Sequence, residues 1–198
     1  MKRFFSFIIA MTLFFIITVN TVYAEDYYFK DEEKTFLVDQ LITSEGGVSS
    51  EDVNSLSQVV AKVDSKVLQA MVNTNWQICL TGSDIASSYT NGEWGSKIRG
   101  ITIYDLRTIY IEPRAILDTP IHEIGHFILW YLDFPVDSDE FYDIYYDEVE
   151  TFKSRIINPG CVSSVDEFFC ESFYYMYEDS SLCTPRVVDF IQRNLDSF

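Results

Sequence analysis

The chain has 198 residues, with 31 acidic side chains against 14 basic ones and a formal net charge of −17. A surface this acidic repels nucleic acids and anionic lipids, so neither is an expected partner. The length is enough for one domain with its own core and short of what two ordinary domains need. We therefore expect a single acidic domain.

The first 24 residues have the pattern of a secretory signal peptide. Lys2 and Arg3 form a basic start, Phe4–Val19 is apolar, and Ala24 is the small residue that a signal peptidase prefers. The apolar run is shorter than the roughly 20 residues of a membrane-spanning helix, although an uncleaved anchor is the alternative. We expect cleavage after Ala24, secretion of residues 25–198, and no stable membrane association. Loss of Lys2 and Arg3 leaves 12 basic residues against 31 acidic ones, a formal charge of −19.

Two helices are expected before the first strand. Lys30–Thr43 has a one-sided apolar pattern and ends before a glycine pair. Ser49 and Asp52 form a capping-box pattern, and the apolar residues that follow recur every three or four positions, so one long amphipathic helix should run to about Asn73. These apolar residues are Val53, Leu56, Val60, Val63, Val67 and Met71.

A small sheet is expected in the middle of the chain. Trp76–Leu80 alternates apolar and more polar residues, and Ile101–Tyr104 and Thr108–Glu112 are rich in β-branched and aromatic residues. Between these strands, Gly82–Gly100 is a long loop that is rich in small polar residues and carries Trp94. Loops of this length are often functional, so Trp94 is a candidate wall of a substrate cleft; an ordinary solvent loop is the alternative.

Four helices follow the sheet. Asp118–Leu132 begins with a proline at its first helical position, Ser138–Ile157 has a heavily acidic outer face, and Ser164–Tyr177 and Thr184–Leu195 complete the chain. No internal repeat or interdomain linker is visible. The sequence therefore predicts a mostly helical domain with a small sheet beside the helix Asp118–Leu132.

The helix Asp118–Leu132 carries the motif His122-Glu123-Ile124-Gly125-His126, and these are the only two histidines in the chain. Residues four apart lie on one helical face, so His122 and His126 can offer two imidazole nitrogens to one zinc ion, with Glu123 beside the metal. The alternative is a chance pair of surface histidines that bind nothing.

A catalytic zinc site usually has three protein ligands, and no third histidine exists. Glu167 and Glu171 have helical i, i+4 spacing in an aromatic segment, so one carboxylate can bind zinc while the other accepts a hydrogen bond from a ligand histidine. The alternative is that Glu167 completes a capping box with Ser164 while Glu171 is solvated.

Four cysteines, Cys79, Cys161, Cys170 and Cys183, allow zero, one or two disulfides in an exported chain. Cys170 lies among apolar and acidic residues of a helical segment, where it can serve as a small packed side chain. A cysteine could also supply a thiolate to zinc, but a carboxylate is better placed.

The motif at His122–His126 and the stretch Asp166–Leu195, with Glu167 in DEFFCESFYYMY, resemble the anthrax lethal factor family and its small secreted relatives, the Pro-Pro endopeptidases. The resemblance implies a zincin-like α+β domain in which His122, His126 and Glu167 bind one zinc ion and Glu123 is the general base. Glu171 is then left to orient a ligand histidine.

The chain departs from this family in two places. The family has a tyrosine seven residues before the glutamate ligand, where its hydroxyl helps to stabilise the tetrahedral intermediate, and here that position is Gly160. The loop that carries Trp-Asp-Asp-Val-Pro-Gly in the Pro-Pro endopeptidases reads Trp94-Gly95-Ser96-Lys97 here, which leaves proline specificity open. A donor to the oxyanion other than zinc would be another tyrosine, an arginine such as Arg99 or Arg107, or a backbone N–H.

We therefore expect a secreted, monomeric, zinc-dependent endopeptidase of the gluzincin type, acting on a protein or peptide substrate. The substrate would lie extended beside an edge strand, for which Thr108–Glu112 is the candidate, with Trp94, Ile109 and Tyr110 lining the cleft. The alternatives are a zinc-binding secreted interaction protein with little or no activity, and a metal-free interaction module.

Overall fold

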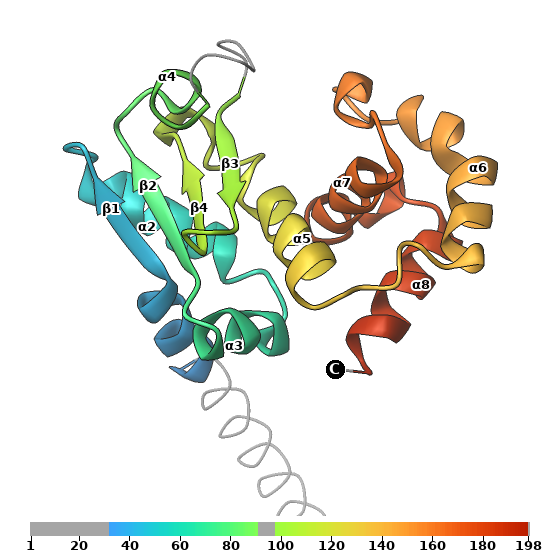
Figure 1. Cartoon of the computed structure of the whole chain (residues 1–198), viewed down its shortest axis with the longest axis horizontal. Helices are drawn as coiled ribbons and strands as arrows, with labels where there is room; N and C mark the ends of the chain where they lie inside the picture. Colours follow the sequence, from blue (N-terminus) through green and yellow to red (C-terminus); the bar gives the residue numbers. More distant parts are fainter. Residues whose placement is uncertain (1–31, 91–97, 198) are drawn as a thin grey trace, which may run out of the picture.

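The computed structural model describes residues 32–90 and 98–197, so the expected signal peptide lies outside the described residues (Figure 1). The strands are β1 (Ile42–Glu45), β2 (Gln77–Thr81), β3 (Gly100–Ile103) and β4 (Thr108–Ile111). Residues 32–41 are helical, and the further α-helices are α2 (Ser50–Val60), α3 (Ser65–Asn73), α4 (Ile85–Tyr89), α5 (Pro120–Tyr131), α6 (Asp139–Lys153), α7 (Val165–Glu178) and α8 (Pro185–Leu195). Short 3-10 helices are Pro113–Ala115, Pro159–Cys161 and Ser180–Leu182.

The four strands form one sheet in the order β1-β2-β4-β3. β1, β2 and β4 are parallel, and β3 pairs antiparallel with β4, so β1 and β3 are the edges within the described residues. The three predicted strands are confirmed, with ends that differ by one residue. β1 was not predicted, because a four-residue strand that directly follows a helix is too short to show a period of two.

One face of the sheet forms the core of this half of the molecule. Thr102 pairs with Ile109, and Ile109 pairs with Ile78, so these three side chains share a face. Ile78 and Ile109 are fully buried, and α5 packs against β3 and β4 on this side. The helix that carries the histidine motif therefore covers the apolar, buried face of the sheet.

The predicted single helix from Ser49 to Asn73 is wrong, because the chain forms α2 and α3 with a break at residues 61–64. Asp64 accepts a hydrogen bond from the backbone N–H of Lys66 and so caps a new helix. The apolar period continues across the break, and Val63 within it is fully buried. The helical spacing of the apolar residues thus predicted the buried face correctly, but it did not reveal that the chain changes direction between α2 and α3.

The second half of the molecule consists of α6, α7 and α8 around an aromatic core (Figure 1). Phe141 of α6, Phe169 of α7 and Phe190 of α8 are buried, and the ring of Phe141 contacts both of the others. α5 lies between the halves, packing against the sheet on one side and against α7 on the other. Within the described residues, no helix is long and apolar enough to cross a membrane.

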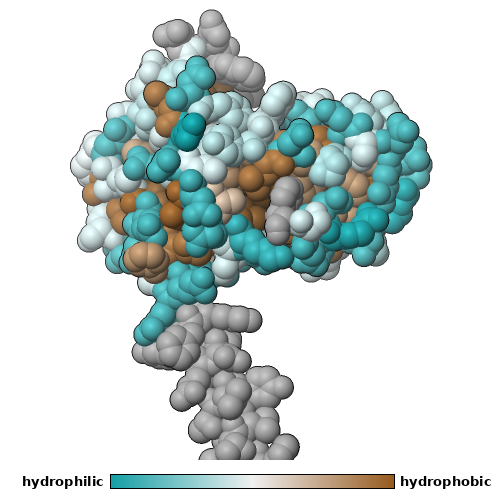
Figure 2. Space-filling view, turned by 60° about the horizontal axis from the view of Figure 1, so that its bottom comes forward, coloured by the Kyte–Doolittle hydropathy of each residue, from teal (hydrophilic) through white to brown (hydrophobic). Residues whose placement is uncertain are grey.

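An apolar pocket lies where the two halves meet, between the start of α3 and the ends of α5 and α8. Figure 2 shows apolar surface gathered along this junction. Its lining residues are Asp64, Lys66, Val67, Ala70, Leu132, Leu195 and Asp196. None of them belongs to the histidine motif or to the predicted glutamate pair, so this pocket is separate from the candidate site.

Candidate metal centre

α5 presents both histidines of the motif on one face. Pro120 occupies the first turn, where a missing N–H costs nothing, and the helix ends at Tyr131 with Asp133 in the left-handed region at a φ of 53°. The helix is apolar on nearly all sides and is buried through the junction of the two halves. His122 and His126 therefore lie within the protein interior and keep side-chain exposures of 14% and 18%.

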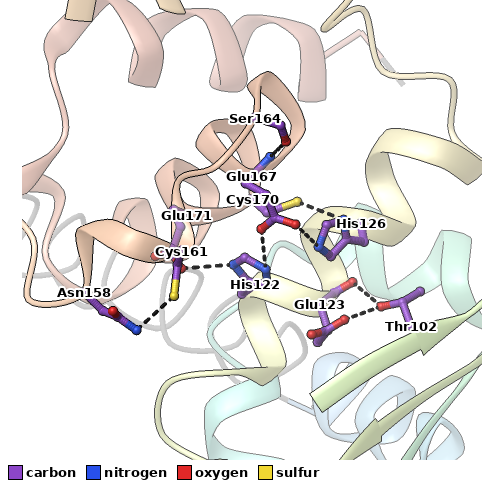
Figure 3. A network of polar contacts seen from close by, with 10 residues as sticks. All are labelled: Thr102, His122, Glu123, His126, Asn158, Cys161, Ser164, Glu167, Cys170 and Glu171. Atoms are coloured by element: carbon purple, nitrogen blue, oxygen red, sulfur yellow. Dashed lines mark hydrogen bonds and ion pairs between the residues drawn. The ribbon is translucent and has the colours of Figure 1, made fainter. Parts of the chain in front are cut away.

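α7 brings Glu167 to the two histidines, as Figure 3 shows. Glu167 Oε2 lies 3.3 Å from His122 Nε2, and Oε1 lies 3.7 Å from His126 Nε2. One ligand atom from each of the three residues lies within 4.8 Å of the other two. Ser164 does cap α7, since its hydroxyl accepts the backbone N–H of Glu167, but the carboxylate itself faces the histidines.

The approach of α5 to α7 depends on Gly125. A Cβ at this position would lie 3.0 Å from the Cα of Cys170 and 3.1 Å from its Sγ, which is tighter than almost all real contacts. Gly125 directly precedes His126 and lies three residues after His122, and Cys170 lies between Glu167 and Glu171 on α7. The two helices are therefore in close contact beside the residues that converge on the candidate metal site.

The other imidazole nitrogens face partners on α7. His122 Nδ1 lies 3.3 Å from Glu171 Oε1, although the pair is not aligned as a hydrogen bond, and Nδ1 has no other partner. His126 Nδ1 lies 3.4 Å from Cys170 Sγ. Each Nδ1 therefore faces a group on α7, and the two Nε2 atoms face Glu167, the arrangement expected of ligand histidines.

The electrostatics of the cluster favour a cation. Burial opposes protonation of His122, but the carboxylates of Glu167 and Glu171 outweigh it and raise the pKa of the imidazole to about 10. Burial likewise opposes ionisation of Glu167, yet His122 and His126 hold the pKa of its carboxyl below the usual value. Burial lowers the pKa of His126, so its imidazole is neutral, whereas the imidazole of His122 carries a proton that a bound metal ion would displace.

Glu123 points to the sheet rather than to α7 (Figure 3). Its side chain is almost fully buried, and Thr102 Oγ1 on β3 donates a hydrogen bond of 2.6 Å to Oε2. Gly100, two residues earlier on β3, leaves room for this contact, because a Cβ there would lie 3.3 Å from Glu123 Cγ and 2.2 Å from a methyl carbon of Thr119. A carboxylate thus lies beside the cluster that could hold a metal ion.

Gly160, the position at which the family that the sequence resembles has a tyrosine, is surrounded by open space. Gly160 lies in the 3-10 helix Pro159–Cys161, and a Cβ there would have no neighbour closer than Asn158 Oδ1 at 3.9 Å. Next to it, Cys161 accepts a hydrogen bond from Asn158 Nδ2 at 2.9 Å. Burial and the nearby carboxylates of Glu171 and Glu167 raise the pKa of the Cys161 thiol to about 11, so the thiol is neutral.

The residues proposed for the substrate cleft need correction. Thr108–Glu112 forms β4, which is an internal strand, and the edge strand beside α5 is β3. Ile109 is fully buried in the core and cannot line a cleft, and Tyr110 lies on the opposite sheet face, stacked on Tyr89. Trp94 lies outside the described residues. The order of strands in a sheet is set by contacts distant in sequence, which no local pattern reports.

All four cysteines are free in the structure. Cys79, Cys170 and Cys183 are buried, as is common for small apolar side chains, and the expectation for Cys170 is confirmed. No sequence pattern indicated that Thr102 contacts Glu123 or that Cys170 contacts His126, because these contacts depend on how β3 and α7 pack against α5.

The fold is that of a zincin-like α+β domain, mostly helical with a four-stranded sheet, and it carries a cluster of two histidines and a glutamate that could bind a metal ion. A solved structure that shares this fold is the Pro-Pro endopeptidase PPEP-2 from Paenibacillus alvei, with a TM-score of 0.63 and 19% sequence identity. The match covers 79% of this chain and 98% of that one. No protein-family model and no curated protein sequence matches this chain.

Proposed function

We propose that the chain is a secreted zinc-dependent endopeptidase of the gluzincin type. The observation that carries the proposal is the convergence of His122, His126 and Glu167 beside the buried carboxylate of Glu123. Two imidazoles and one carboxylate are a frequent ligand set of catalytic zinc, which keeps a fourth position for water or substrate. The likeness to a Pro-Pro endopeptidase supports the proposal, and we extend it to the lethal factor-like family on the motif residues.

In the proposed reaction, water hydrolyses a peptide bond. When bound, zinc would polarise the scissile carbonyl and lower the pKa of a water molecule. Glu123 would accept one proton from this water and deliver it to the leaving amide nitrogen. The water oxygen bonds to the carbonyl carbon, and the C–N bond breaks. The new carboxyl group keeps the second proton of the water and then passes it to the amine, so the products are a carboxylate and an ammonium group. Glu171 would hold the imidazole of His122 in the orientation that a ligand needs.

The substrate would lie along β3, the edge of the sheet next to α5. Arg99 O accepts the N–H of Glu112, and hydrogen-bonded pairs alternate along an antiparallel ladder, so the backbone groups of Gly100 and Thr102 point away from β4. An extended peptide could add to this edge as a further strand. Main-chain pairing of this kind would fix the scissile bond relative to Glu123.

The test is a screen of the zinc-loaded protein against mixed and proline-rich peptide libraries, with product masses read by mass spectrometry. We expect cleavage by the wild type, about one zinc per chain, and an activity loss of at least a hundredfold in Glu123→Gln with zinc retained. Glu148→Gln is the matched control, because Glu148 is also a buried carboxylate but binds Thr184 between α6 and α8. A chain that never retains zinc, or a Glu123→Gln variant as active as wild type, would refute the proposal.

A second candidate is a zinc-binding secreted interaction protein without useful turnover. The observation that favours it is the empty position at Gly160, where the resembling family has a tyrosine for the tetrahedral intermediate. The same library screen separates the two candidates, since zinc retention without cleavage of any peptide supports the second one.

The proposed location is outside the cell, following removal of residues 1–24. N-terminal sequencing of protein recovered from the culture medium should begin at Glu25. We also propose that the enzyme is a monomer that binds neither nucleic acid nor membranes. Size-exclusion chromatography should then give the mass of one chain.

A further inference from the structure

Thr102 is the group that holds the carboxylate of Glu123. Its hydroxyl lies 2.6 Å from Glu123 Oε2 and 3.2 Å from the Glu123 carbonyl oxygen. A hydroxyl has a single proton, and the shorter contact is the charge-assisted one, so this proton goes to the carboxylate. Among residues 32–90 and 98–197, no other group is hydrogen-bonded to this carboxylate.

The partner of a buried carboxylate has a large effect on its position. Glu123 has only 7% of its surface exposed, so solvent cannot replace a lost hydrogen bond without a rearrangement. Its side chain has rotatable bonds that point it either toward the sheet or toward the two histidines. A donor on β3 limits this freedom and keeps the carboxylate at the edge of the sheet.

β3 itself is fixed against the start of α5. A Cβ on Gly100 would lie 2.2 Å from Thr119 Cγ2, which means that backbone and helix are already in contact at this point. The backbone of β3 at Gly100 therefore packs directly against the side chains of Thr119 and Glu123, which holds Thr102 close to the start of α5.

Thr102 also lies where a substrate strand would pair. Its side chain faces the core with Ile109, whereas its backbone N–H and C=O point to the free edge of β3. One residue thus contacts the proposed base through its side chain and can contact a bound peptide through its backbone.

We propose that Thr102 is a positioning residue that orients Glu123 and couples this orientation to the pairing of a peptide with β3. The inference rests on the proposed peptidase function. Pairing with the peptide holds the backbone of Thr102 in place, its hydroxyl holds the carboxylate, and the proton acceptor is then fixed relative to the bond to be cleaved. A misplacement of about 1 Å at such a group can lower a rate roughly a hundredfold.

The experiment compares Thr102→Val, Thr102→Ser and Thr81→Val as mature, zinc-loaded proteins. Valine removes the hydroxyl at nearly constant volume, and serine keeps it. Thr81→Val is the control, because it removes a Thr–Glu hydrogen bond, to the exposed Glu45, from the opposite face of the same sheet. On one cleaved peptide, we expect Thr102→Val to lower kcat by about tenfold or more with KM within about threefold of wild type.

Thr102→Ser should recover most of kcat, and Thr81→Val should match wild type. A Thr102→Val enzyme with wild-type kcat overturns the inference. So does a Thr102→Ser enzyme as slow as the valine variant, because the effect would then come from packing of the methyl group.

Crystal structures of the zinc-loaded wild type and Thr102→Val give a second measurement that needs no activity. We expect the Glu123 carboxylate within hydrogen-bond distance of Thr102 in the wild type and rotated away from β3 in the variant. An unmoved carboxylate overturns the inference. If the wild type cleaves no peptide, the proposed function fails, and these two structures still decide whether Thr102 positions Glu123.

Discussion

Gly125→Ala tests whether close contact between α5 and α7 builds the metal site. The new Cβ would lie 3.0 Å from the Cα of Cys170, whereas ordinary contacts are 3.4 Å or longer, so the helices must separate by a few tenths of an ångström. Because the nearest atom belongs to the backbone, no side-chain rotation relieves the contact. Alanine favours a helix over glycine by about 1 kcal/mol, and overpacking a core costs about 1–3 kcal/mol. We expect a net loss of stability of up to about 2 kcal/mol.

The larger effect should be on metal binding. Glu167 Oε1 is already 3.7 Å from His126 Nε2, and added separation of α7 from α5 moves it further from a shared ion. Ligand distances tolerate only about 0.2 Å, so we expect zinc affinity to fall by about tenfold.

Competition with a chromophoric chelator measures the affinity, and urea unfolding of the zinc-free protein measures stability. Gly160→Ala is the control, because a Cβ there meets open space. If Gly125→Ala binds zinc as tightly as wild type and resists urea better, the reasoning from close contact is refuted.

Two further predictions concern the surroundings of the site. Gly160→Tyr should raise kcat by tenfold or more if the tyrosine hydroxyl reaches the oxyanion, since removal of one such donor lowers kcat by roughly 10²–10³ in other enzymes. Steady-state kinetics measure the change, with Gly160→Phe, which lacks the hydroxyl, as the control. An equal gain in Gly160→Phe would show that packing alone is responsible. Glu171→Gln should weaken zinc binding by roughly 10- to 100-fold, because His122 Nδ1 loses its carboxylate neighbour. Chelator competition checks the second prediction, and unchanged affinity would show that Glu171 does not orient the ligand.

The metal cluster could be predicted from sequence because its parts are local. His122 and His126 are one helical turn apart, and Glu167 and Glu171 are one turn apart on a second helix, so spacing alone places each pair on a face. The chain has only two histidines, so no other imidazole could be a ligand. The three ligand atoms do meet within 4.8 Å, although the roles assigned to them remain predictions.

The surroundings of Glu123 could not be predicted in the same way. Thr102 reaches Glu123 only because β3 pairs with β4 at one register and lies at the sheet edge next to α5. A shift of one residue would turn Thr102 to the other face. The choice of Thr108–Glu112 as the edge strand failed for a similar reason, because β2, which is distant in sequence, pairs with β4 on the side opposite β3.

No disulfide links the described residues, so a metal ion bound at the candidate site would be a cross-link between distant parts of the chain. A metal ion held by His126 and Glu167 would close a loop of about 40 residues that contains all of α6. If the ion acted as a covalent cross-link does, the lost entropy of the loop would raise the free energy of the unfolded chain by about 4 kcal/mol at 25 °C. If residues 25–198 are exported as proposed, the ion would take the place of a disulfide cross-link, and its loss outside the cell would favour unfolding as well as loss of the proposed activity.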